Sequence, residues 1–305
     1  MANLRTALII PTYNAAGTLS LLLNTIQRQT IKPDHILVID SSSSDTTTEI
    51  LKAHNIPYTT IKKSDFNHGT TRKYATSLTD ADVYMFLTQD VSFANEHAIE
   101  SILKAFTDEK VGCAYGRQLP NKDAAVLVAH QRLFNYPATS SIKTYKDRKH
   151  LGINVCMNSD NFAAYRKTAL LDIGGLPENV IVSEDMYAAA KMLMHGWKIA
   201  YKSDALIYHS HNYTTAQEFK RYFDIGVFHA MNPWILETFN SHIGDGFKYL
   251  QSAIKYCINN RAYFTLPKVI INGLMMYLGF FIGRHYTLIP NSIRKKISMC
   301  GFFWK

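Results

Sequence analysis

The chain has 305 residues, of which 47% are hydrophobic, and a formal net charge of +9. A chain of this length can bury a large core and suggests one large domain, or one domain with an appendage. The four cysteines are widely scattered without metal or redox spacing, so we interpret them as reduced thiols of a cytoplasmic protein. The apolar run that follows Arg5 is too short for a signal peptide.

The first part of the chain alternates short apolar runs with helical patterns. The runs at residues 6–10, 35–39, 58–61 and 83–87 are typical of strands, and the last is apolar throughout, as in strands buried on both faces. Apolar side chains recur at helical spacing in residues 19–26. Strand and helix alternating at short intervals predict an α/β fold with a doubly wound, mostly parallel sheet.

Polar residues stand where these strands end: Thr12 and Asn14 after the first, Asp40 after the second and Asp90 after the fourth. Ligands of open α/β sheets bind beyond the carboxyl ends of strands, so this pattern predicts a nucleotide crevice. No G-x-G-x-x-G or Walker A motif is present, which argues against the usual dinucleotide and P-loop folds. Asp90 has two possible roles: holding a divalent cation against a diphosphate, or capping the helix that begins near Ala98.

Two motifs carry a resemblance to a known family: residues 9–14, Ile-Ile-Pro-Thr-Tyr-Asn, and residues 38–45, Val-Ile-Asp-Ser-Ser-Ser-Ser-Asp. They resemble the opening of the family 2 glycosyltransferases, which have a GT-A fold and bind the nucleotide of a sugar donor with this segment. The resemblance implies donor contacts from Pro11, Thr12, Tyr13, Asn14 and Asp40. A carboxylate such as Asp40 can accept a hydrogen bond from the N3–H of uracil or thymine; the alternative is a turn residue.

A third motif, Asn-His-Gly-Thr-Thr-Arg at residues 67–72, resembles the rhamnosyltransferase branch of this family. The resemblance implies donor contacts from Asn67 and His68 and places Arg72 against the base and ribose. An isolated helical arginine is also typical of a solvated or salt-bridging side chain, which is the alternative for Arg72.

The fourth strand is followed by Thr88-Gln89-Asp90, where most members of the family carry Asp-x-Asp. This form also resembles the rhamnosyltransferase branch, and it implies donor contacts from Gln89 and Asp90. A single acid, helped by the diphosphate and water, can still hold Mg²⁺ or Mn²⁺. We therefore expect Asp90 to be a metal ligand as well.

Ser183-Glu184-Asp185 precedes a helical apolar face, so Ser183 or Glu184 is a plausible N-cap. Inverting glycosyl transfer needs a carboxylate that can deprotonate the acceptor hydroxyl. The resemblance implies that Asp185 is this general base, and that residues 154–166 form the acceptor-side wall, where Asp160 and Arg166 could be structural.

Residues 205–211 are expected to form a strand that ends in His209 and His211, with both imidazoles on one side. They could share one metal or phosphate with Asp90, as a late histidine does in GT-A enzymes, or simply be hydrogen-bonded. Lys220 and Arg221 could reach the diphosphate or a lipid phosphate, or lie on a solvated helix face.

The C-terminal part is helical, aromatic and basic: from His242 onward it has nine lysines and arginines but one acid. Its apolar run, residues 269–282, spans fourteen residues, fewer than the about twenty of a transmembrane helix. We expect an interfacial helix on an anionic membrane surface, with basic residues and the final Phe302-Phe303-Trp304 in the headgroup region. The alternative is a helical pair packed on the catalytic domain. The aromatics do not interleave with the charges, which argues against nucleic acid.

Together these features predict a GT-A catalytic domain at residues 1–228, with a nucleotide-binding half (1–115) and an acceptor half (116–228), and a helical basic extension at 229–305. The expected function is inverting transfer of L-rhamnose from dTDP-L-rhamnose to a lipid-linked oligosaccharide, for a surface polysaccharide, on the cytoplasmic face of the membrane. A UDP-sugar donor and a non-catalytic scaffold subunit are the alternatives. A processive synthase is disfavoured, because several spans and a Gln-x-x-Arg-Trp motif are missing.

Overall fold

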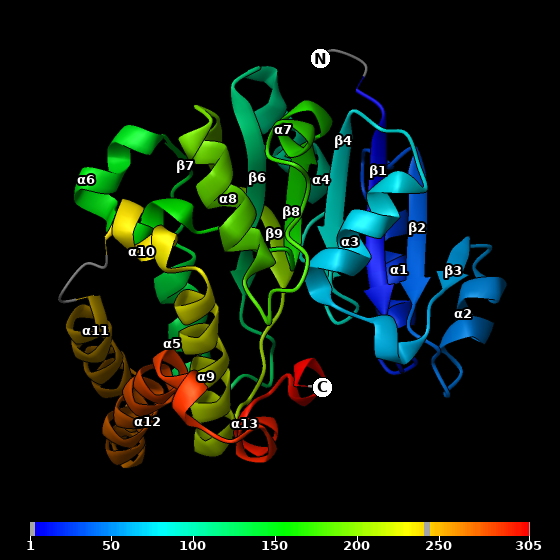
Figure 1. Ribbon diagram of the computed structural model, residues 1–305. Coiled ribbons are helices and arrows are strands. Elements are labelled where there is room, and N and C mark those ends of the chain that lie inside the picture. Colours follow the sequence, from blue (N-terminus) through cyan, green and yellow to red (C-terminus); the bar gives the residue numbers. More distant parts are fainter. Residues whose placement is uncertain (1–3, 241–244, 305) are drawn as a thin grey trace.

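The computed structural model describes residues 4–240 and 245–304, and its centre is one mixed β-sheet (Figure 1). The strand order is β3-β2-β1-β4-β8-β6-β9-β5, and β7 pairs with β9. Helices cover both faces of the sheet, and further helices gather beside its second half. The fold is therefore α/β, as expected.

The first half of the sheet is parallel, as predicted. It consists of β1 (Thr6–Thr12), β2 (His35–Asp40), β3 (Tyr58–Thr60) and β4 (Val83–Leu87). The connecting helices are α1 (Leu19–Gln27), α2 (Thr47–Ala53) and α3 (His68–Ser77). Every residue of β4 is buried, which explains its unbroken apolar sequence.

The second half of the sheet is mixed. It consists of β5 (Ser92–Phe93), β6 (Val111–Leu119), β7 (Ser141–Lys143), β8 (Phe162–Arg166) and β9 (Lys198–Tyr208). Strand β8 runs antiparallel to both of its neighbours, β4 and β6, while β6 and β9 are parallel. The helices of this half are α4 (Ala98–Leu103), α5 (Val126–Asn135), α6 (Arg148–Leu151), α7 (Lys167–Asp172) and α8 (Glu184–Met194).

The C-terminal part consists of α9 (Thr215–Met231), α10 (Pro233–Phe239), α11 (Asp245–Asn259), α12 (Leu266–Arg284), α13 (Asn291–Ile297) and the short 3₁₀ helix η7 (Gly301–Phe303). The expected boundaries at 115/116 and 228/229 fall inside β6 and α9, so the chain is continuous across both. Trp304 is buried in the same core cluster as β6 and β8. The division into domains stays a prediction.

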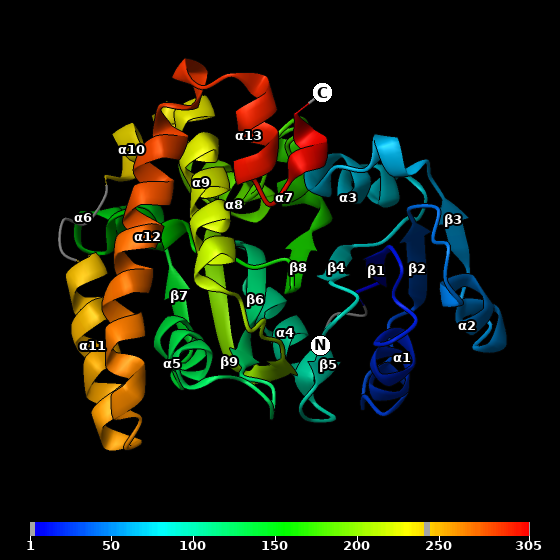
Figure 2. The same ribbon diagram turned by 90° about the horizontal axis from the view of Figure 1, so that it is seen from below.

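Helices α9 and α12 lie side by side in Figures 1 and 2, and glycines bring their backbones together. A Cβ atom built on Gly279 of α12 would lie 2.4 Å from the carbonyl oxygen of Phe219 in α9. A Cβ on Gly283 would lie 2.1 Å from the carbonyl of Phe223, and one on Gly226 would lie 2.3 Å from that of Phe280. Only glycine permits this close approach.

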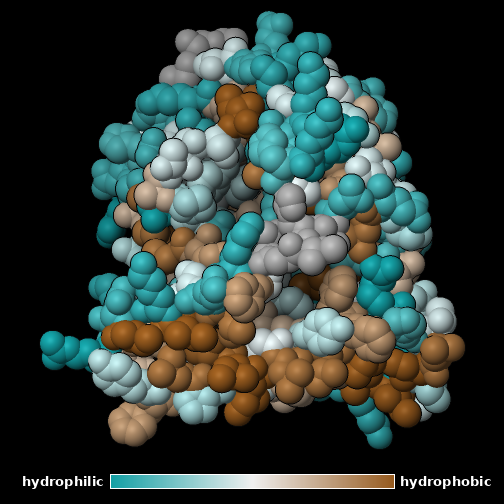
Figure 3. Space-filling model, turned by 90° about the vertical axis from the view of Figure 1, so that its left-hand side faces the viewer, coloured by the Kyte–Doolittle hydropathy of each residue, from teal (hydrophilic) through white to brown (hydrophobic). Residues whose placement is uncertain are grey.

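The apolar helix extends beyond the fourteen-residue apolar run at 269–282. Residues Tyr263–Arg284 form 22 residues of helix whose length and composition would allow a membrane crossing. Only 17% of its apolar window is buried, so it is not a core helix. Its outward face is a band of exposed apolar side chains (Figure 3), formed by Ile270, Ile271, Leu274, Tyr277 and Phe281.

The aromatic end of the chain does not join this band, which corrects the expectation for residues 302–304. Trp304 is 6% exposed and packs against Phe223 and Tyr286, with ring centroids 6.3 Å and 5.7 Å away. The guanidinium of Arg294 lies over the Trp304 ring. The tail therefore folds back onto the catalytic core.

Candidate active site

Two adjoining cavities open at the carboxyl ends of β1 and β4. The smaller has a volume of about 390 Å³ and the larger about 620 Å³, and both are lined by His68, Arg72, Thr88 and Phe302. The smaller cavity contains most of the expected donor residues, since its other lining residues are Pro11, Thr12, Tyr13, Ser41, Lys63, Phe66 and Gln89. Asp90, His209, His211 and Asp185 all line the larger cavity.

The Gln89 side chain joins the ends of β1 and β4 at the smaller cavity. Its Oε1 accepts from the backbone N–H of Tyr13 at 2.7 Å, and its Nε2 donates to the Tyr13 carbonyl at 3.1 Å. Lys63 donates to the Tyr13 hydroxyl at 2.6 Å and also lies 4.2 Å from the centroid of that ring. Gln89 therefore holds the backbone of Tyr13 and Lys63 holds its side chain, so Tyr13 is a fixed part of the cavity lining.

Three expected donor residues, Asp40, Asn14 and Asn67, hold the protein's own backbone and do not line either cavity. Asp40 is 1% exposed and accepts hydrogen bonds from Thr12 Oγ1 and from the backbone N–H and hydroxyl of Ser43. Asn14 accepts from the N–H of Ser44. This is the turn role that the sequence left open for Asp40, and its contact with a base stays a prediction.

Asn67 is the N-cap of α3. Its Oδ1 accepts from the backbone N–H groups of Gly69 and Thr70, and its Nδ2 donates to the carbonyl of Val180 at 2.7 Å. A Cβ on Gly69 would lie 1.9 Å from the carbonyl oxygen of Pro177. The Asn-His-Gly motif therefore docks α3 against the loop that leads to Asp185.

Asp90, His209 and His211 form a cluster, as the sequence predicted. Their candidate ligand atoms lie within 4.8 Å of one another, and Asp90 Oδ2 is 3.4 Å from His209 Nε2 and 3.1 Å from His211 Nε2. The capping role for Asp90 does not apply, because the N-cap position of α4 is occupied by His97. The two histidines follow β9, which ends at Tyr208, rather than belonging to it. Burial alone would raise the pKa of Asp90, but hydrogen bonds from His209 and His211 hold it well below its usual range.

A buried glutamine orients His209. Gln118, 1% exposed, donates through Nε2 to Tyr136 and Ser159, which turns its Oε1 toward His209 Nδ1 at 2.9 Å. If a cation were bound beside Asp90, His209 would carry its proton on Nδ1, toward Gln118, and offer the lone pair of Nε2 to that cation. Arg132 donates to the same Gln118 oxygen at 2.9 Å.

The cluster suits a divalent cation. It offers one carboxylate and two imidazoles from a partly buried site, and a diphosphate and water could complete the coordination. Mg²⁺ prefers oxygen ligands, whereas imidazole suits transition metals, so this donor set favours Mn²⁺ over Mg²⁺. No other cluster of this kind was found among residues 4–240 and 245–304.

The larger cavity is also lined by three acids and Arg72. Arg72 is 3% exposed, and its guanidinium lies 2.6 Å from Glu184 Oε1 and 3.5 Å from Asp160 Oδ2. Tyr165 donates to Asp160 at 2.6 Å. The salt-bridging alternative for Arg72 is what the structure shows, and a contact with base or ribose stays a prediction.

Asp185 lies beside this ion pair and also lines the cavity. Its Oδ2 accepts from the backbone N–H of Asp160 at 3.2 Å, and its Oδ1 accepts from that of Met186 at 2.7 Å. Burial, Glu184 and Asp160 raise the pKa of Asp185 well above its usual range. Ser183 occupies the N-cap position of α8 in the left-handed region at φ 63°, without a side-chain capping bond. Such backbone strain is typical of functional sites.

Several cavity residues were missed because no local pattern marks them. Arg132 comes from α5, and its Nε is buried without a hydrogen-bond partner. Asp224 from α9 and Phe302 from the tail also line the cavity. Arg221, which the sequence left between two roles, lines it as well.

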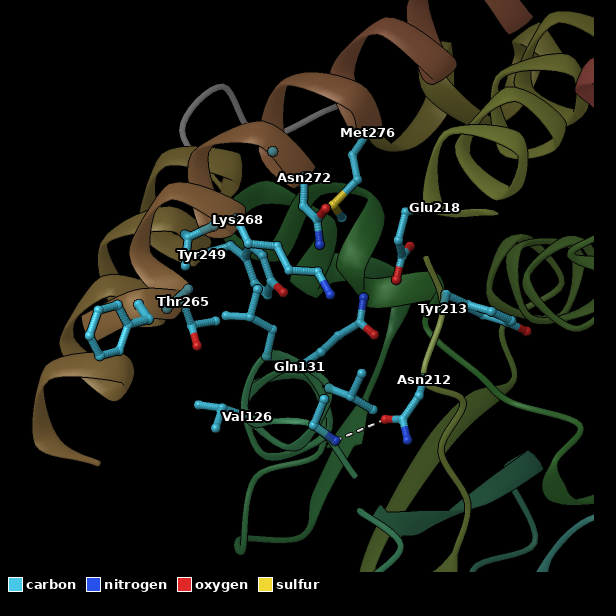
Figure 4. Close-up of a pocket in the computed structure, with 17 residues that line it drawn as sticks. Val126, Gln131, Asn212, Tyr213, Glu218, Tyr249, Thr265, Lys268, Asn272 and Met276 are labelled. Carbon is cyan, nitrogen blue, oxygen red and sulfur yellow. Dashed lines mark hydrogen bonds between the residues drawn. The ribbon is translucent and has the colours of Figure 1, made fainter. Parts of the chain in front are cut away.

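A further cavity of about 240 Å³ lies between α5, α11 and α12 (Figure 4). Gln131, Lys268 and Asn272 reach toward its middle, and Glu218 lies at its edge. Tyr213 lines both this cavity and the larger one. None of the predicted site residues lies in it.

Comparison with known proteins agrees with this geometry. The family model "Glycosyl transferase family 2" matches residues 7–174, which include ten of the eleven residues that line the smaller cavity and twelve of the twenty-seven that line the larger one. The chain is a family 2 glycosyltransferase. The glycosyltransferase is 43% identical over 303 residues to the O-antigen chain rhamnosyltransferase RfbN of Salmonella typhimurium, covering 99% of this chain and 96% of RfbN. It is 43% identical over 300 residues to the O-antigen chain rhamnosyltransferase WbaN of Salmonella anatum, covering 97% and 95%.

Solved structures show the same fold. The mannosyltransferase PcManGT from Pyrobaculum calidifontis, in complex with GDP-Man and Mn²⁺, matches with a TM-score of 0.60 at 18% identity, covering 98% of this chain and 85% of that one. S. aureus TarS 1–349 matches with a TM-score of 0.56 at 15% identity, covering 97% and 83%. The GT-A expectation is thereby confirmed at the level of the fold.

Proposed function

We propose that this glycosyltransferase transfers L-rhamnose, with inversion, from dTDP-L-rhamnose to a lipid-linked oligosaccharide in O-antigen assembly. The observation that carries the reaction type is one cavity that holds both the Asp90–His209–His211 cluster and the Asp185 carboxylate. The choice of sugar and pathway is supported by RfbN and WbaN, which align with nearly the whole chain.

In this proposal Asp185 accepts the proton of the acceptor hydroxyl while that oxygen bonds to the anomeric carbon. The bond from the anomeric carbon to the diphosphate oxygen breaks on the opposite face, so configuration inverts and dTDP leaves with the bonding electrons. Arg132 and Arg221 line the same cavity and place positive charge near the departing diphosphate. A divalent cation held by Asp90, His209 and His211 would add Lewis-acid stabilisation of that charge.

The test measures nucleotide release from dTDP-, UDP- and GDP-sugars with a membrane extract as acceptor. We expect release from dTDP-L-rhamnose, and we expect Asp185→Asn to lose about 10²–10⁴-fold in rate, the usual contribution of a general base. Donor binding, measured by calorimetry, should survive in that variant. Asp204→Asn is the matched control, because Asp204 is exposed on β9 outside both cavities.

The outcomes separate the alternatives. Release from a UDP-sugar alone would keep the reaction and discard rhamnose. Turnover of Asp185→Asn like that of the wild type would end the assignment of the base. Donor binding without release under any condition would favour the non-catalytic scaffold.

We also propose that the protein is peripheral on the cytoplasmic face of the cell membrane, with the exposed face of α12 in the headgroup region of an anionic leaflet. Support comes from the exposed apolar band on α12 and from the basic character of the chain after His242. The glycine contacts fasten α12 to α9, and α9 also lines the larger cavity. Because α12 is packed against α9 in this way, we expect it to lie in the membrane plane and not to cross the membrane.

Co-sedimentation with anionic and neutral vesicles tests this placement. Ile271→Asp with Leu274→Asp should reduce binding to anionic vesicles, because both side chains lie in the exposed band at 53% and 57% exposure. Leu21→Asp is the matched control, with an equally exposed leucine (59%) on α1. Equal binding of all three proteins would instead favour a helix that only packs on the catalytic domain.

A further inference from the structure

The C-terminal tail, residues 298–304, reaches the junction of the two cavities. Phe302 lines both of them, and in the smaller one it lies beside Phe66, which is 236 residues away in sequence. The rings of Phe66 and Phe302 are 5.9 Å apart in an edge arrangement. Figures 1 and 2 both show the end of the chain beside α3.

The tail is held in this place by bonds that do not involve Phe302. Asp224 of α9 is 1% exposed, and its Oδ2 accepts from the backbone N–H groups of Met299 at 2.8 Å and Cys300 at 3.1 Å. Trp304, two residues after Phe302 in the sequence, is buried. With both flanks anchored in the core, Phe302 is presented to the cavity while 46% of its surface stays exposed.

The smaller cavity beside this ring combines aromatic and cationic side chains. Tyr13, Phe66 and Phe302 contribute aromatic rings to its lining, and Lys63 and Arg72 contribute positive charges. Such a lining suits a ligand that has a flat ring and an anionic group, such as a nucleoside diphosphate.

We propose that the tail is a wall of the donor site, and that Phe302 contacts the nucleoside of the nucleoside diphosphate sugar. This inference rests on the proposed function, since it takes the smaller cavity as the nucleotide site. Asp224 is then a positioning residue, which acts on the donor only through the tail. The C-terminal extension thus contributes directly to donor recognition.

Calorimetry with dTDP and the full-length protein tests the proposal. Phe302→Ala should weaken dTDP binding roughly tenfold, the usual effect of losing one aromatic contact with a base, and Phe302→Tyr should retain it. Phe247→Ala, at an exposed position of α11 (64%), is the matched control. If the wild type binds no nucleotide, the proposed function fails. If the wild type and Phe302→Ala bind dTDP equally, this inference alone is overturned.

Two further variants test whether the position of the tail, rather than the stability of the fold, determines dTDP binding. Asp224→Ala should also weaken dTDP binding, and combining it with Phe302→Ala should add little, because both changes remove the same contact. Additive losses would contradict the positioning role. In Phe302→Cys the new thiol would be the accessible one, because Cys113, Cys156, Cys257 and Cys300 are all buried. We expect dTDP to protect it from alkylation, and an unprotected thiol would overturn the proposal.

Discussion

Replacing Gly279 by alanine tests whether the close contact between α9 and α12 holds the C-terminal part in place. The new Cβ would lie 2.4 Å from the carbonyl oxygen of Phe219, so the two helices would have to separate. Overpacking of this kind costs about 1–3 kcal/mol. Alanine also favours the helix over glycine by about 1 kcal/mol, which partly offsets that cost.

The same helix provides the matched control. A Cβ on Gly273 would meet only Leu250 Cδ1, at 3.8 Å, which is ordinary contact. Gly273→Ala should therefore keep the gain in helix propensity without the clash, and stabilise the protein by about 0.5–1 kcal/mol. Because propensity is common to both variants, the difference in their stability isolates the steric cost.

Thermal unfolding of the two variants measures this difference. A steric cost of about 1–3 kcal/mol corresponds to a Tm for Gly279→Ala that is several degrees below that of Gly273→Ala, at about 2–4 °C per kcal/mol. Equal Tm values, or a higher value for Gly279→Ala, would refute the close packing of α9 and α12. Urea unfolding should give the same order.

Three other outcomes follow from the larger cavity. Asp185 has a raised pKa and accepts the proton only when it is ionised, so activity should fall as the pH drops through that pKa. The acid limb of the kcat/KM profile should therefore lie above the ordinary pKa of an aspartate, and a limb near pH 4 would contradict the assignment. His211→Ala should weaken Mn²⁺-dependent donor binding at least about tenfold, measured by calorimetry with and without a chelator. If the wild-type protein binds the donor equally well in both conditions, the proposed metal role is wrong. Arg132→Met should weaken dTDP roughly tenfold but thymidine little, since Arg132 has an unpaired buried Nε and lines the larger cavity but not the smaller one proposed for the nucleoside; equal losses would contradict this.

The sequence best predicted the residues whose role follows from their position in a strand or at its end. Unbroken apolar runs identified β1, β2 and β4, and the polar residues at their ends pointed to the cavities. The resemblance to GT-A enzymes associated the two histidines with Asp90, and the structure brings the three side chains together.

The sequence was least informative where a role depends on partners far along the chain. Gln118 orients His209 from 91 residues away, and Arg72 pairs with Glu184 from 112 residues away. No period or spacing encodes such contacts. The motif that contains Asn67 was associated with the donor, but the Asn67 side chain caps α3 locally and donates to the carbonyl of Val180, 113 residues away.

Helix α9 explains why the extension and the catalytic site are hard to separate. One part of its surface supplies Arg221 and Asp224 to the larger cavity, while Gly226 contacts the backbone of α12. The exposed band of α12 is therefore fixed relative to Asp185 through a single helix. If that band lies on a membrane, the cavity keeps one orientation to the bilayer, and an acceptor held there by its lipid is presented at a high effective concentration. The expected boundary at residue 228 would cut the element that links the exposed band of α12 to the site.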